Sequence, residues 1–283
     1  MAKLGKITRG LRRALTKQKA VQHLIHEGPE KLATAFAAMN MANRADRYRR
    51  RQWASFKVPK MRAVADTRYS FTPQFLSGAA IFARRAHELE GPVIGEVAQS
   101  EYMACVVGSV TQAAAALEAE ISEVTMHGPG HHLGSNDIDA TARAFLVPLA
   151  DTIDGEAPLH RYDLVLHLLG KPALDQGTQP YQNADMLVGL RNELIHYESK
   201  WGDQMNRKKL FKGLQQLRFE YPKFLPSGMT NFFPHRCLSS SLASWSVATA
   251  TSFINAFYVR LGISSPLEAY PMITVLPPVS FLR

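Results

Sequence analysis

The sequence contains little cysteine, and this scarcity excludes several classes of protein. Only Cys105 and Cys237 occur among 283 residues, and they lie far apart in the chain. Such spacing supports neither a disulfide framework nor a cysteine-based metal site. We therefore expect two buried or free thiols in a reducing, cytoplasmic compartment, and no metal or other cofactor.

Long apolar runs are also lacking. No stretch reaches about 18 uninterrupted apolar residues, so no membrane span is expected. Residues 242–261 come nearest, but their serine, threonine and asparagine side chains suit a packed helix better. The N-terminus has no long apolar core after its first charges, which argues against a secretory signal.

Acidic residues are scarce in the first quarter of the chain. Residues 1–70 hold 17 Lys and Arg against 4 Asp and Glu, whereas the remaining 213 residues hold 16 against 20. The whole net charge of +9 therefore originates near the N-terminus. This asymmetry predicts a polyanionic partner, most simply RNA, because Lys and Arg gain affinity by displacing counterions from phosphates.

Two segments of this basic region have competing interpretations. Residues 1–26 show helical spacing of leucine and isoleucine among basic residues, which suits a helix on RNA or a membrane surface, a targeting segment, or a solvated tail. Tyr48 and Trp53 flank three consecutive arginines that could grip a single-stranded nucleic acid, and the alternative is a solvated cluster. The three arginines are Arg49, Arg50 and Arg51.

Helical periodicity dominates the rest of the chain, and neither an internal repeat nor strong strand alternation is present. We predict an all-α protein whose core is a helical bundle. After an interruption at Gly91 and Pro92, a long helix is expected from residue 96 to a loop at 127–137. The last long helix is expected from Arg236 to Gly262, with Trp245 in the core. The expected divisions are a basic N-terminal extension (1–72), a connecting helix (73–95), the bundle (96–263) and an extended, proline-rich tail (264–283).

The sequence GLRNELIHYESKW, residues 189–201, contains the candidate site. The spacing of Arg191 and His196 alone carries no weight, because about two such pairs are expected by chance in this chain. A second pair, Arg161 and His167, does occur. On a helical wheel Arg191 borders an apolar stripe that faces the bundle, formed by Leu187, Leu190, Leu194, Tyr197 and Trp201. A partly buried guanidinium needs an acidic or phosphate partner.

The helical wheel also raises a difficulty for a single-copy site. Asn192 and His196 share one face, but Arg191 and His196 lie about 140° apart around an ideal helix. They converge only if the helix deforms near His196 or if a second copy completes the site. A symmetric homodimer would supply that copy.

The stretch LRNELIHY resembles the signature of the HEPN superfamily (higher eukaryotes and prokaryotes nucleotide-binding), in which Arg, a polar residue and a following His recur. GSVTQAAAALEAEISEV (108–124) resembles the first core helix of that family, and residues 236–263 resemble its last. The resemblance covers roughly residues 96–263 and implies a helical bundle that acts on RNA as a dimer.

The resemblance also implies a chemistry and a role for each motif residue. Family ribonucleases of toxin or phage-defence type cleave RNA without metal, through attack of the 2′-hydroxyl on the adjacent phosphate. His196 would transfer protons, Arg191 would hold the phosphate, and Asn192 would orient either group. Some family toxins carry a tyrosine two positions after the histidine, which an antitoxin modifies. Here that position is Glu198.

Further residues have competing interpretations. Lys208 and Lys209 follow the motif and could contact RNA phosphates, or they could belong to a solvated helix face. Glutamates at positions 118, 120 and 123 could pair with Arg191 or be ordinary surface residues. The alternatives to the ribonuclease are a non-catalytic module that binds RNA, a nucleotide or a protein, and a structural protein in which Arg191 pairs with an internal carboxylate. An antitoxin or regulatory partner is a further expectation.

Overall fold

The structure is a computed structural model that describes residues 70–128, 142, 144–197, 209–226, 228–229 and 231–281. These residues form helices joined by turns, and they contain no strand beyond one isolated bridge between Phe219 and Phe281. The prediction of an all-α protein is confirmed for this part of the chain. Four of the predicted nucleic-acid contacts lie outside the described residues: Arg49, Arg50, Arg51 and Lys208.

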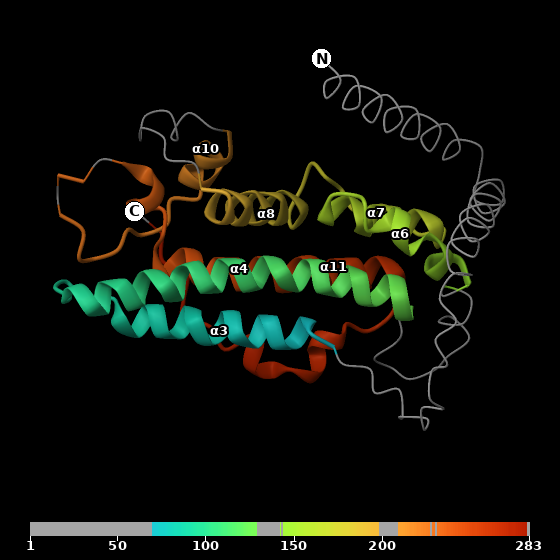
Figure 1. Cartoon of the computed structure of the whole chain (residues 1–283), viewed down its shortest axis with the longest axis horizontal. Helices are drawn as coiled ribbons and strands as arrows, with labels where there is room; N and C mark the ends of the chain where they lie inside the picture. Colours follow the sequence, from blue (N-terminus) through green and yellow to red (C-terminus); the bar gives the residue numbers. More distant parts are fainter. Residues whose placement is uncertain are drawn as a thin grey trace, which may run out of the picture.

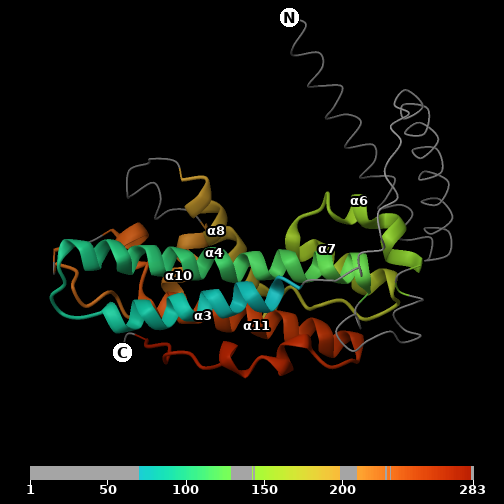
Figure 2. The ribbon, with the colours of Figure 1, turned by 60° about the horizontal axis from the view of Figure 1, so that its bottom comes forward.

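Three long helices form the central layer: α3 (Thr72–Leu89), α4 (Glu96–His127) and α11 (Ser240–Leu261). They lie side by side in both views (Figure 1, Figure 2). A short turn joins α3 to α4, where Gly91 and Pro92 interrupt the helical pattern as expected. The sequence predicted α3 as a connector between the basic region and the bundle. The structure corrects this, because α3 packs against both α4 and α11.

Small side chains explain the close contact of these three helices. The positions buried on α3 are mostly alanine, and Ala113, Ala114 and Ala116 on α4 are fully buried as well. Small residues let two helix backbones approach closely. The buried Ser109 hydroxyl lies 3.0 Å from the carbonyl oxygen of Ala79 and 3.1 Å from that of Ala243, so it links all three helices.

Shorter helices lie along one side of this layer (Figure 1). They are η2 (Val147–Leu149), α6 (Ala150–Ile153), α7 (Pro158–Leu168), α8 (Tyr181–Ile195) and α10 (Lys209–Gln216). Tyr162 anchors α7: its ring meets Phe253 and Phe257 edge to face at 4.9 and 4.8 Å, and its hydroxyl donates to the Leu117 carbonyl at 2.6 Å. Edge-to-face pairs of this kind add to the free energy gained by burying the rings.

The last long helix starts later than the sequence predicted. A helix was expected from Arg236 to Gly262, whereas α11 begins at Ser240. The Ser239 hydroxyl caps it by accepting from the Leu242 N–H at 3.2 Å, and a separate helical turn, η3 (Phe232–Arg236), precedes it. Gly262, with φ of 80°, ends α11 as a left-handed cap.

The C-terminal segment was predicted to be extended, and the structure corrects this in part. Two short 3₁₀ turns, η4 (Pro266–Ala269) and η5 (Pro271–Ile273), fold the segment back onto the central helices. Leu267 and Ile273 bury their side chains there. Arg84 on α3 fastens the segment, because its guanidinium donates to the carbonyl oxygens of Val275 at 2.9 Å and Met272 at 3.5 Å.

Replacement of Arg84 by methionine is expected to lower the free energy of unfolding by about 1–2 kcal/mol, because charge-assisted bonds to two carbonyl groups are lost while the aliphatic stem is kept. Urea denaturation measures the change. Arg85→Met on the same helix is the control and should have a smaller effect, since Arg85 pairs with the exposed carboxylates of Glu88 and Glu101. Equal effects would show that Arg84 does not fasten the C-terminal segment.

Both cysteines and Trp245 are buried, as the sequence predicted. One helix among the described residues, α4, is long and apolar enough to cross a membrane by length and composition alone. In the structure 56% of its most apolar window is buried inside the protein, as expected for the core helix of a bundle. The sequence had indicated residues 242–261, in α11, as the nearest approach to a span.

Candidate functional site

Helix α8 presents the motif residues, and its buried side chains explain how. Ala184, Leu187 and Leu190 are fully buried against the central layer. Gly189 allows α10 to pack closely on the other side, since the space where a Cβ would stand lies 3.3 Å from Leu210. This packing fixes which way the next turn of α8 faces.

Arg191 follows directly after this buried face, as the helical wheel predicted. Its side chain is 17% exposed, and its guanidinium forms an ion pair with the carboxylate of Glu118 on α4. Partial burial lowers the pKa of Arg191. The group remains charged at neutral pH, because arginine does not deprotonate in proteins. The ion pair therefore adds a polar contact between α8 and α4 at the edge of the buried interface.

The double-mutant cycle of Glu118→Gln and Arg191→Met is expected to give a coupling energy of about 1 kcal/mol, typical of a partly exposed ion pair with good geometry. Urea denaturation of the four proteins supplies the numbers. As a control, the cycle of Glu118→Gln with Arg161→Met should be additive, since Arg161 pairs with Asp154 instead. Additivity in the first cycle as well would mean that the ion pair is absent in solution.

His196 is the residue that ends the helix. Helix α8 ends at Ile195, and His196 adopts φ −106° and ψ 41°, which is not helical. Its N–H still donates to the Asn192 carbonyl at 2.9 Å, so it closes the last turn. That bond is the ordinary i to i−4 bond of a helix, so the Cα of His196 keeps its place on the helical wheel, and Arg191 and His196 remain about 140° apart around the helix.

Asn192 and His196 are both exposed, and neither side chain bonds to another residue in the part of the chain that the structure describes. Ile195 and Tyr197 beside them are also exposed, at 55% and 54%. The sequence placed Tyr197 and Trp201 on the buried stripe. This was wrong for Tyr197, because the chain has left the helix there, and Trp201 lies outside the described residues.

The three glutamates of α4 differ in their environment. Glu118 pairs with Arg191, one of the outcomes the sequence left open. Glu120 is 1% exposed and accepts a hydrogen bond from the Tyr258 hydroxyl at 2.5 Å. Glu123 accepts from the backbone N–H of Phe71 at 2.8 Å. The sequence left open whether these glutamates are ordinary surface residues, and in the structure all three bind other groups of the protein.

The second Arg–His pair is explained by local structure. Arg161 donates to the Asp154 carbonyl oxygen at 2.7 Å and to the Glu156 carbonyl oxygen at 3.0 Å, so it closes the turn between α6 and α7. Its side chain is also ion-paired with Asp154 at 3.2 Å. His167 is exposed in the last turn of α7. This pair offers a matched control for the motif in α8.

Basic and aromatic side chains lie at the α8 end of the molecule. Lys209 and Lys212 are exposed on α10, which packs against α8. The sequence did not indicate Arg236, whose guanidinium lies 4.9 Å from the centre of the Tyr221 ring. No spacing signal could reveal this contact, because the two residues are 15 positions apart in an irregular segment.

Among the described residues, no group of three or more histidine, cysteine, aspartate or glutamate side chains is arranged to hold a metal ion. His131 and His132, two adjacent histidines that could bind a metal or simply lie in a loop, are outside these residues. The chemistry that the candidate site offers is therefore that of an imidazole, an amide and a guanidinium. Comparison with models of known families, with curated proteins and with solved structures finds no match for this chain.

Proposed function

We propose that the protein is a metal-independent endoribonuclease of toxin or defence type, which cleaves RNA at a site completed by a second copy of the chain. The observation that carries this proposal is the last turn of α8. There Asn192 and His196 are exposed to solvent, and Arg191, in the same stretch of α8, is ion-paired with Glu118. The resemblance of LRNELIHY to the HEPN signature assigns these three residues their roles.

The chemistry follows from the side chains. His196 takes the proton of the 2′-hydroxyl or gives one to the leaving 5′-oxygen, because imidazole transfers protons near neutral pH. The attacking oxygen forms a bond to the phosphorus, the bond to the 5′-oxygen breaks, and a 2′,3′-cyclic phosphate remains. Arg191 stabilises the charge that develops on the phosphate, and Asn192 orients the imidazole or the phosphate.

The dimer is supported by the surface around His196. Ile195 and Tyr197 expose apolar side chains directly beside the two polar groups. Exposed apolar residues gathered at one place mark surfaces that bind another molecule. A two-fold axis near this end of α8 would bring both copies of His196 and Arg191 together. The basic residues 1–70 and Lys209 would bind the RNA backbone.

Incubation of the full-length protein with single-stranded RNA in EDTA tests this function. We expect cleavage that leaves 2′,3′-cyclic phosphate ends, together with a dimer by analytical ultracentrifugation at the assay concentration. A strict monomer that cleaves RNA would exclude the composite site, and the absence of any cleavage would favour the second candidate.

That second candidate is a non-catalytic module that binds RNA, a nucleotide or a protein partner. The ion pair between Arg191 and Glu118 favours it. A partly buried guanidinium needs an anionic partner, and the carboxylate of Glu118 already supplies one, so no RNA phosphate is required. Arg191→Lys separates the two candidates. Lysine can keep the ion pair with Glu118, but it lacks the planar fork that holds a phosphate with two bonds.

A further inference from the structure

Residues 206–236, which follow the motif, carry a local excess of basic side chains. They hold 7 Lys and Arg against 1 Asp or Glu, whereas the rest of residues 71–283 hold 9 against 19. Phenylalanine and tyrosine are interleaved with these charges. Basic and aromatic side chains together are typical of surfaces that bind single-stranded nucleic acid, because the charges hold the phosphates and the rings stack on the bases.

The described part of this segment lies beside the end of α8 (Figure 1). The Phe233 ring of η3 lies 4.5 Å from the Phe211 ring of α10 and 6.4 Å from the ring of Tyr197, the residue after His196. Helix α10 in turn packs against α8. These contacts place η3 and α10 next to the residues to which we assign RNA cleavage.

Arg236, the last residue of η3, differs from the other partly buried arginines among the described residues. Arg84 donates to two carbonyl groups, and Arg161 and Arg191 pair with carboxylates. The Arg236 guanidinium lies over the Tyr221 ring, 4.9 Å from its centre, and no hydrogen bond or ion pair joins it to another described residue. A partly buried guanidinium needs an anion, so the missing partner is one that binds from outside.

The Tyr221 ring positions the guanidinium without using its donors. An arginine that lies over a ring is attracted to the ring face, and its N–H groups stay free for oxygen acceptors. Their planar fork matches two oxygen atoms of a phosphate. Because the side chain is already held in place, less conformational freedom is lost when a phosphate binds.

The surroundings of Arg236 suit a polyanion that also carries aromatic groups. His235 is exposed beside it, and Lys212 is exposed on α10, which packs against η3. Within the described part of this segment, the one acidic side chain is Glu220. An acidic protein segment would be attracted by the same charges, but it has no bases to stack on the neighbouring rings. Single-stranded RNA therefore fits this surface better.

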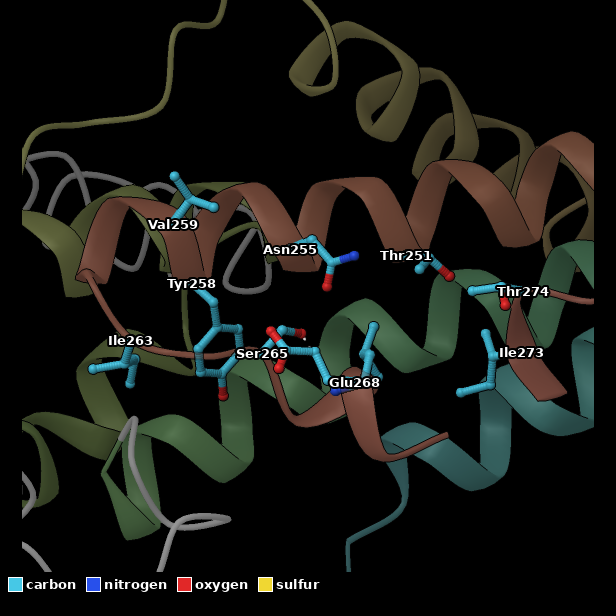
Figure 3. A pocket seen from close by; sticks show the side chains of 10 residues that line it. Thr251, Asn255, Tyr258, Val259, Ile263, Ser265, Glu268, Ile273 and Thr274 are labelled. Carbon is cyan, nitrogen blue, oxygen red and sulfur yellow. Dashed lines mark hydrogen bonds between the residues drawn. The ribbon is translucent and has the colours of Figure 1, made fainter. Parts of the chain in front are cut away.

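The hollow of about 370 Å³ between α11 and residues 263–274 has no comparable group (Figure 3). The Thr251 side chain is turned toward Thr274, and the Asn255 amide is exposed. Glu268 is the one charged side chain among the described residues that line the hollow, and it is exposed as well. A solvated carboxylate needs no ligand, whereas the guanidinium beside α8 lacks its anion.

We propose that Arg236 binds a phosphate of the single-stranded RNA that reaches the end of α8. The inference rests on the proposed action on RNA and names a binding residue for it. Arg191 already has the carboxylate of Glu118 as its partner, so Arg236 supplies a guanidinium that is free to hold the strand. The strand then passes along η3 toward His196, which the contact between Phe233 and the next residue places nearby.

Titration of the full-length protein with 2′-O-methyl hexauridylate tests the proposal without cleavage, because the methyl groups block attack by the 2′-oxygen. Backbone amide shifts of residues 232–237 supply a local dissociation constant, so binding to residues 1–70 is not counted. We expect saturable shifts there at about 0.15 M salt, and much weaker binding of hexaglutamate, which has a comparable charge but no bases. Shifts confined to residues 1–70, or equal binding of hexaglutamate, would overturn the proposal.

Variants of Arg236 locate the contact. Arg236→Gln should weaken the local binding about fivefold or more and lower the slope of log affinity against log salt concentration by about 0.7, the share of one phosphate on a single strand. Arg236→Lys keeps the charge, so it should keep the slope but lose part of the affinity. Arg260→Gln removes the same charge at the opposite end of α11, about 30 Å away, and should bind as the wild type does. An unchanged slope in Arg236→Gln would contradict the proposal.

The outcome can be told apart from that of the cleavage assay. If the protein binds the 2′-O-methyl strand through Arg236 but cleaves no RNA, the phosphate contact stands and the function is that of an RNA-binding module. If RNA is cleaved and Arg236→Gln binds and cleaves as the wild type does, the contact is wrong and the endoribonuclease stands.

Discussion

Replacement of His196 by alanine is expected to lower the rate of RNA cleavage by about 10²–10⁴-fold, the usual contribution of a positioned general acid or base. His196 is exposed at the end of α8, and its side chain makes no bond to another described residue. The substitution therefore removes a proton-transfer group without removing a packing contact. Single-turnover kinetics on a defined single-stranded RNA in EDTA measure the loss, because product release does not limit that rate.

His167→Ala is the matched control for this prediction. His167 is also an exposed histidine near the end of a helix, and it belongs to the Arg–His pair that occurs by chance. Its exchange should leave the cleavage rate unchanged. If the His196→Ala protein keeps the wild-type rate, the proposed site is wrong. If both histidine variants lose activity equally, the loss does not come from chemistry at the end of α8.

The Arg191 variants show whether the guanidinium acts on the phosphate. Arg191→Ala should lower the cleavage rate by an amount similar to His196→Ala, because the negative charge that develops on the phosphate in the transition state loses the guanidinium that stabilises it. Compared with Arg191→Ala, Arg191→Lys should recover stability through the ion pair with Glu118 but should recover little of the cleavage rate. A lysine variant that recovers both would mean that Arg191 supplies only a positive charge to the fold.

Much of the fold could be predicted, because its determinants are local. The apolar stripe and alanine content of α4 predicted a helix that the structure places within a few residues of the expected bounds. Gly91, Pro92 and Gly262 marked real interruptions. The beginning of α11 was missed by four residues, because serines stand at positions 239, 240 and 241 and the sequence does not show which of them caps the helix. The packing of α3 into the centre depends on contacts with α11, about 160 residues away in the chain, and no local pattern contains them.

The candidate site was predictable in part. The position of Arg191 at the edge of the core followed from the helical wheel. Its partner Glu118 belongs to another helix, so the sequence could only name it among three glutamates. The end of α8 at Ile195 carries no glycine or proline signal. There the chain leaves the helix and the Tyr197 ring comes to lie 6.4 Å from that of Phe233, a tertiary contact that overrides the helical period.

A steep loss of stability above about pH 10 is expected, because the core contains phenol and thiol groups that resist ionisation. Tyr102, Tyr162 and Tyr258 are fully buried, and Cys237 is 1% exposed. Burial raises the pKa of all four groups, and the carboxylate of Glu120 raises that of Tyr258 further. In the unfolded chain they ionise near pH 8.5 for cysteine and near pH 10 for tyrosine.

The direction of the effect follows from proton binding. Above these ordinary pKa values the unfolded chain has lost its protons while the folded protein keeps them, so rising pH favours unfolding. The contribution of each group is fully present below its unfolded pKa and is lost as the pH rises toward its folded pKa. Each group costs up to about 1.4 kcal/mol per pH unit. From about pH 8.5 the thiol of Cys237 acts together with that of Cys105, whose pKa burial also raises. Cys237 and the three tyrosines together remove about 5 kcal/mol per pH unit above pH 10.

Urea denaturation at intervals between pH 8 and pH 11, with tyrosinate absorbance recorded in parallel, checks this prediction. Ionisation of the buried tyrosines should coincide with unfolding and should not precede it. Cys237→Ala should reduce the early decline below pH 10 and leave the steep part, and the remaining early decline belongs to Cys105. Tyr270→Phe, which alters an exposed tyrosine, serves as the control and should leave the slope unchanged.

Since a domain of ordinary stability has only about 5–15 kcal/mol to lose, the protein should unfold within one to three pH units above pH 10. A free energy of unfolding that stays level to pH 11 would contradict the burial of these groups in the core.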